Sequence, residues 1–168
     1  MLEYFSKYNL NFKKIIDGYS PISISSLNLD QKYHQKFLNS KIYYNNGYYV
    51  TDNEIIDADL LRSSNNYDDD SRYEYSVNKI FVNDFLSDNI RDNRLLFIGV
   101  ELSIILKDKL ILTFPNEKFK IVVSYDMINE DGFEDCMITF YKYRTSDGNI
   151  LLEDLNLYNN SAVAVIET

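Results

Sequence analysis

Residues 119–144, FKIVVSYDMINEDGFEDCMITFYKYR, contain two strand-like runs on either side of a short polar segment. The runs 119–127 and 136–144 are rich in Ile, Val, Tyr and Phe, which favour β-strands. The segment between them, 128–135, holds one glycine and four carboxylates. Two strands joined by a short turn pair antiparallel, so this stretch predicts the centre of an antiparallel sheet.

Runs of similar composition lie on both sides of this stretch. They are RLLFIGVELSIIL (94–106), KLILTF (109–114) and SAVAVIE (161–167), separated by short polar turns. This arrangement predicts an antiparallel meander in the C-terminal half of the chain. Several runs are apolar on both faces, so we expect helices to cover one side of the sheet.

The N-terminal part predicts those covering helices. Its first apolar residues recur at helical spacing and end before Gly18, and Asp30 is a plausible N-cap for a second helix over 31–41. The apolar residues of the first helix are Phe5, Tyr8, Phe12, Ile15 and Ile16. The predicted fold class is therefore α+β, an antiparallel sheet covered by N-terminal helices.

Residues 41–51, KIYYNNGYYVT, carry the clearest local signal in the chain. Asn46-Gly47 supplies the two positive-φ residues of a type I′ turn, so this segment predicts a β-hairpin. Residues 52–71 read as a loop, and 73–89 fit either a strand or a helix.

Length and composition indicate one domain, residues 1–168, with 45% hydrophobic residues available for a core. A single cysteine, Cys136, fits a reducing compartment. The N-terminus carries charges where a secretory signal would be apolar, and the longest apolar stretch (95–106) contains Glu101. We expect a cytoplasmic protein without a membrane segment.

The net charge of −9 is unevenly distributed along the chain. Residues 51–92 carry 4 basic and 11 acidic side chains, and residues 129–168 carry 2 and 8. Such a chain repels phosphate backbones, which disfavours nucleic acid as a partner. It attracts a partner with a basic surface.

No residue combination predicts a catalytic centre. The one histidine, His34, stands among Lys and Gln as on a helix surface, and Glu134 and Asp135 disfavour the thiolate of Cys136. We expect Cys136 to be buried and inert. The 26 carboxylates leave an enzyme that uses scattered acids as an alternative.

Metal and cofactor motifs do not fit either. An EF-hand loop that starts at Asp68 would need an acid at Arg72 and a glycine at Tyr73. The five isolated glycines form no phosphate-binding loop. We therefore expect no metal and no cofactor.

Three segments combine tyrosine or phenylalanine with carboxylates, as protein-recognition surfaces do: 67–75, 129–136 and 151–160. We expect 67–75 or 130–135 to contribute the surface. The hairpin at 43–49 is a further candidate, because an exposed aromatic edge can dock by strand addition. The predicted partner-binding residues are Tyr67, Asp68, Asp69, Asp70, Tyr73, Glu74, Glu130, Asp131, Glu134 and Asp135.

In size, acidity and Asn/Ile/Lys/Tyr-rich composition, the whole chain resembles the small immunity proteins of bacterial polymorphic toxin systems, including contact-dependent growth inhibition. The resemblance implies a non-enzymatic protein that binds and neutralises a cognate toxin domain, commonly a basic nuclease. A viral host-interaction protein and a secretion chaperone remain alternatives.

Overall fold

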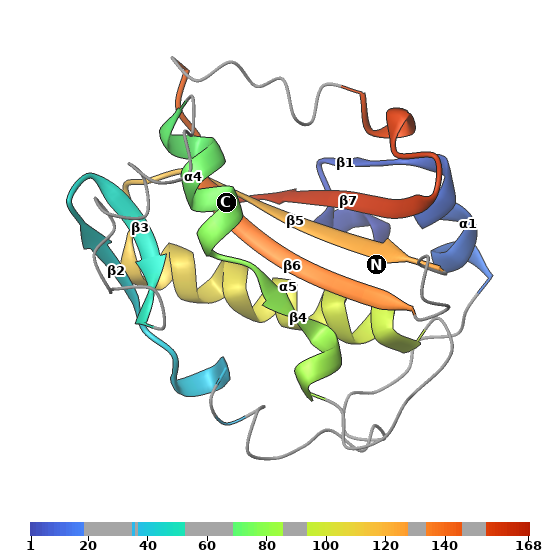
Figure 1. Ribbon diagram of the computed structural model, residues 1–168, viewed down its shortest axis with the longest axis horizontal. Coiled ribbons are helices and arrows are strands. Elements are labelled where there is room, and N and C mark those ends of the chain that lie inside the picture. Colours follow the sequence, from blue (N-terminus) through green and yellow to red (C-terminus); the bar gives the residue numbers. More distant parts are fainter. Residues whose placement is uncertain (19–34, 36, 53–68, 86–93, 128–133, 146–153) are drawn as a thin grey trace.

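A five-stranded antiparallel sheet forms the centre of the fold (Figure 1). The computed structural model describes residues 1–18, 35, 37–52, 69–85, 94–127, 134–145 and 154–168. The strand order is β1-β7-β5-β6-β4. The strands are β1 (Lys7–Tyr8), β4 (Ile80–Phe81), β5 (Phe119–Asp126), β6 (Asp135–Lys142) and β7 (Ser161–Glu167). The α+β class and the antiparallel sheet are therefore confirmed.

Strands β5 and β6 pair along their whole length, from Phe119 opposite Lys142 to Asp126 opposite Asp135. The order beyond them differs from a meander, because β7 pairs with β5 and not with β6. The chain thus returns across the sheet after β6. This crossover makes β5 the central strand, with β6 on one side and β7 on the other.

The segments 94–106 and 109–114, expected to be strands, belong almost entirely to one long helix, α5 (Arg94–Thr113). Ten of its residues are buried, because α5 lies along the face of the sheet (Figure 1). A helix covered on most sides loses its polar face, and its apolar run then resembles that of a buried strand. Thus α5, from the middle of the chain, forms most of the helical layer.

Helix α1 (Leu10–Asp17) completes this layer beside β7 (Figure 1). It starts later than predicted, because Asn9 caps it by accepting the N–H of Phe12 at 3.0 Å. The preceding residues form a 3-10 turn, η1 (Leu2–Tyr4), and the short strand β1. Phe12 and Ile16 of α1 join the same core as α5 and the inward side chains of β5, β6 and β7.

The opposite face of the sheet has a smaller apolar cluster. Helix α4 (Asp70–Val77) places Tyr75 against it, and the 3-10 turn η6 (Leu155–Leu157) contributes Leu155. The strand residues of the cluster are Val122, Tyr141, Val163 and Val165. Residues 73–89, ambiguous in sequence, thus begin within α4, followed by β4 and the 3-10 turn η4 (Val82–Phe85).

The predicted hairpin is confirmed as β2 (Ile42–Asn45) and β3 (Tyr48–Thr51), a separate two-stranded sheet. Asn46 and Gly47 have φ values of 49° and 94°, as the turn requires. Of the second predicted helix, the structure describes only Gln35 and 37–39 as helical, and Asp30 and His34 lie outside the described residues. Within the described parts of the chain, no helix is long and apolar enough to cross a membrane.

Candidate functional site

In the first predicted recognition segment, 67–75, most described residues make contacts within the fold. Tyr67 and Asp68 lie outside the described residues. Asp69 caps α4 by accepting the N–H of Arg72 at 2.7 Å, and its carboxylate lies 3.5 Å from Nε of the same arginine. Asp70, the first residue of α4, is half-buried. Of the predicted partner-binding residues in this segment, Asp69 and Asp70 are thus the ones that are described and partly accessible.

Tyr73 and Glu74, predicted to contact a partner, are both fully buried. Glu74 accepts the backbone N–H groups of Tyr49 at 2.9 Å and Lys142 at 2.7 Å. Arg144 pairs with the same carboxylate, its Nη2 lying 2.6 Å from Oε1. Glu74 therefore ties α4 to β3 and β6, and it is not part of an exposed surface.

The Tyr73 ring packs against Tyr48 of the hairpin, with 4.8 Å between ring centroids. The prediction that Tyr73 and Glu74 contact a partner is therefore wrong, because the helical periodicity of α4 turns both side chains toward the rest of the fold. Tyr73 and Glu74 lie on the side of α4 that faces β3 and β6, a side that the polar sequence of this helix does not reveal.

The second predicted segment covers the part of the chain that joins β5 to β6. Glu130 and Asp131 are outside the described residues, whereas Glu134 and Asp135 are described and half-buried. Asp126, which the sequence reading missed, stands directly opposite Asp135. We call Asp126, Glu134 and Asp135 the acidic end of the sheet.

The strand pairing explains the acidic end. Like charges directly opposite one another across two strands destabilise the pair, so a nearby cation is favoured there. The Ser161 hydroxyl donates to Asp126 and partly compensates its charge. The signal that could have located Asp126 is its place as the last residue of one predicted strand, across the turn from Glu134 and Asp135.

Cys136 follows the acidic end and is completely buried, as expected. Burial raises the pKa of its thiol above the ordinary range, and the charges of Asp126 and Asp135 raise it further. A protonated, inaccessible thiol is a poor nucleophile. Across the described residues, no group of three or more His, Cys, Asp and Glu side chains is arranged to hold a metal ion.

The hairpin presents only half of its tyrosines. Tyr43 and Tyr44 on β2 are exposed to 38% and 61%, whereas Tyr48 and Tyr49 on β3 are buried. Burial, followed by a hydrogen bond with Glu117, raises the pKa of Tyr49 to about 12. The aromatic edge of the hairpin is therefore β2, and β3 anchors it to Phe114 and Phe119.

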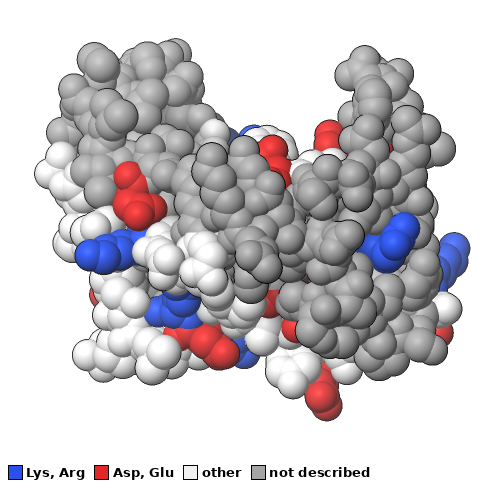
Figure 2. Space-filling view, turned by 90° about the horizontal axis from the view of Figure 1, so that it is seen from below, with Lys and Arg blue, Asp and Glu red and all other residues white. Residues whose placement is uncertain are grey.

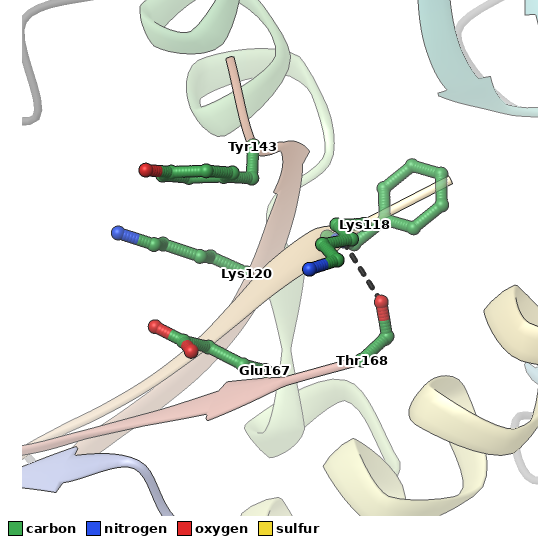
Figure 3. Close-up of a pocket in the computed structure, with 6 residues that line it drawn as sticks. Lys118, Lys120, Tyr143, Glu167 and Thr168 are labelled. Carbon is green, nitrogen blue, oxygen red and sulfur yellow. Dashed lines mark hydrogen bonds between the residues drawn. The ribbon is translucent and has the colours of Figure 1, made fainter. Parts of the chain in front are cut away.

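A pocket of about 260 Å³ lies at the other end of the sheet, which we call the lysine pocket (Figure 3). Figure 3 shows Tyr143, Lys120 and Glu167 projecting side by side from three neighbouring chain segments. Burial lowers the pKa of Lys120, partly countered by Glu167. The described residues that line the pocket are Lys118, Phe119, Lys120, Tyr143, Glu167 and Thr168.

Elsewhere the charges of the described residues are mixed. Figure 2 shows basic and acidic side chains interspersed on one face of the molecule. The acidic end and the lysine pocket are separated by the length of β5, from Lys120 to Asp126, which is about 20 Å at roughly 3.3 Å per residue.

Comparison with known proteins assigns the chain to a family. It belongs to the Uncharacterized protein PM0498 family, and the match covers residues 7–168. The chain is 32% identical over 115 residues to Uncharacterized protein PM0498 of Pasteurella multocida (strain Pm70). This alignment covers 68% of the chain and 66% of that relative, just under two thirds of the relative's length. No solved structure shows a significant match.

Proposed function

We propose that this protein is a non-enzymatic binding protein of the immunity type, which neutralises a cognate toxin domain with a basic surface in the cytoplasm. The observation that carries the proposal is the acidic end, where Asp126 faces Asp135 across two paired strands and Glu134 adjoins them. Arg or Lys side chains of a partner would form charge-assisted hydrogen bonds with these carboxylates.

In the sequence, the segment that joins β5 to β6 carries two further acidic residues, Glu130 and Asp131. A nuclease needs a positive groove to hold phosphates, and an acidic protein surface can occupy that groove. Opposite charges would also accelerate association, to about 10⁸ M⁻¹s⁻¹ at low salt. The exposed edge of β2 with Tyr44 is a second contact that such a partner could use.

The test is a tagged pulldown from a lysate of the source organism, with wild type and a Glu134→Gln/Asp135→Asn variant. The proposal predicts a basic protein that co-purifies with wild type in low salt and is lost or strongly reduced with the variant. Co-expression of wild type should also protect cells from the toxicity of that captured protein.

A matched control removes two charges elsewhere: Asp52→Asn/Asp108→Asn, both on exposed positions. This control should retain the partner, because neither residue lies at the acidic end. Equal loss with both double variants would contradict a localised acidic site. A captured partner that is harmless to cells would contradict the neutralising role.

A further inference from the structure

Helix α4 takes up backbone hydrogen bonds at the edges of two strands that do not pair with each other. The strands are β3 of the hairpin and β6 of the main sheet, and α4 contacts both (Figure 1). An open strand edge presents unpaired N–H and C=O groups, which can pair with a strand of another chain. What covers these two edges therefore decides whether they are open to such pairing.

Glu74 of α4 supplies acceptors to both edges. Its Oε1 accepts the N–H of Tyr49 on β3 at 2.9 Å, and its Oε2 accepts the N–H of Lys142 on β6 at 2.7 Å. Ser71, about one turn earlier in α4, donates its hydroxyl to the C=O of the same Lys142 at 3.1 Å. An ionised carboxylate only accepts hydrogen bonds, so it suits a place where two N–H groups converge.

Asn78, the C-cap of α4, supplies the opposite chemistry. Its side-chain nitrogen donates to the C=O of Tyr49 at 2.8 Å and to the C=O of Phe140 on β6 at 3.2 Å. Its side-chain oxygen accepts the N–H of Thr51 on β3 at 3.2 Å. The residue is only 1% exposed, and both of its N–H groups and its oxygen are used by the two strand edges.

Like groups of the two edges thus converge on α4. The N–H groups of Tyr49 and Lys142 meet at Glu74, and the C=O groups of Tyr49 and Phe140 meet at Asn78. Strands pair when the N–H of one meets the C=O of the other, so β3 and β6 cannot bond each other directly in this arrangement. Without α4, each edge would have to find a different strand.

We propose that α4 protects the edges of β3 and β6 from pairing with strands of a second copy of this chain. A second copy carries the same edges, and an antiparallel pair of identical edges matches N–H groups with C=O groups about a two-fold axis. Covering an edge with a helix is one way in which proteins prevent such association. This role needs neither the acidic end nor a toxin, so it can fail independently of the proposed function.

The variant Asn78→Leu tests the proposal, because it keeps a side chain of similar size and removes all three hydrogen bonds of Asn78. We expect this variant to associate as its concentration rises, which sedimentation velocity detects as a shift to larger species. The control is Gly99→Ala, which disturbs the packing of α5 on the other face of the sheet and leaves α4 unchanged. The two variants are compared at the same interval below their own unfolding midpoints, and the control should sediment as wild type does.

Hydrogen exchange then locates the new contacts. In the associated Asn78→Leu protein, the amides of at least one edge, Tyr49 and Thr51 on β3 or Lys142 on β6, should be better protected than in the dilute protein. A new strand ladder would use these amides. Association no stronger than that of Gly99→Ala, or association that leaves both edges unprotected, would overturn the proposal.

Wild type provides a second measurement, which serves even if Asn78→Leu fails to fold. Release of α4 would expose the amides of Tyr49, Thr51 and Lys142 together, so native-state hydrogen exchange should give them the same opening equilibrium. The amide of Val122, on the central strand β5, should open more rarely. Different opening equilibria for the β3 and β6 amides would contradict the role of α4 as their common cover.

Discussion

At the scale of single residues, Glu74 is an example of a buried position that the sequence does not predict. The segment YDDDSRYEY is polar, and nothing in it marks one carboxylate as buried. Burial follows from long-range partners: Arg144 and the N–H groups of Tyr49 and Lys142. Cys136 was predictable because it begins an apolar strand, whereas Glu74 depends on contacts that only the tertiary fold creates.

Replacing Glu74 by Gln should strongly destabilise the protein. The change removes the countercharge of the Arg144 guanidinium, whose side chain is only 14% exposed, which costs about 3–5 kcal/mol of unfolding free energy. The control Glu117→Gln breaks the more exposed pair with Lys142, and it should cost less than about 1 kcal/mol. Urea unfolding of the two variants measures both values, and similar losses would contradict the structural role of Glu74.

Tyr49 predicts a pH dependence. Its pKa is about 12 in the folded protein against an ordinary value of 10, so the unfolded chain loses this proton first as the pH rises. Stability should therefore fall between about pH 10 and 12, and Tyr49 should contribute no pH dependence below that window. Tyr49→Phe removes this contribution. Its stability, followed by urea unfolding across the window, should fall less steeply than that of wild type, and identical slopes would contradict the assignment.

At the scale of elements, whether a helix or strand could be predicted from the sequence depends on how completely it is buried. The β2–β3 hairpin and the β5–β6 pair were predictable from local turn chemistry and strand-forming residues. Helix α5 was not, because ten buried residues remove its amphipathic pattern. The pairing of β7 with β5 could not be predicted from the sequence either, because strand order depends on packing across the sheet.

Gly99 tests how α5 packs on the sheet. A Cβ at this position would lie 2.6 Å from Sγ of Cys136 and 3.4 Å from Val123. Although alanine favours helices, Gly99→Ala should destabilise the protein by about 1–3 kcal/mol through overpacking.

Removing the Cys136 sulfur should relieve that contact. The double variant Gly99→Ala/Cys136→Ala should be less destabilised than the sum of the single variants, by about 1 kcal/mol or more. Thermal and urea unfolding of the four proteins gives this coupling energy. Strict additivity would show that Gly99 and Cys136 do not share the contact.

At the scale of the whole molecule, the acidic character comes mostly from segments outside the described framework. The described residues hold 13 of the 17 basic and 15 of the 26 acidic side chains, a net charge of −2 (13 − 15). This near balance fits the mixed charges in Figure 2. Charge counting along the sequence thus predicted an acidic protein, but only the pairing of β5 with β6 brings Asp126 next to Asp135.

The most direct test of the account is the salt dependence of the dissociation constant between this protein and its captured basic partner. We predict that binding weakens steeply with added salt. We also predict that Glu134→Gln/Asp135→Asn weakens it further and reduces the slope, whereas Asp52→Asn/Asp108→Asn changes neither. An affinity that is independent of salt and equal in all three proteins would contradict recognition by the acidic end.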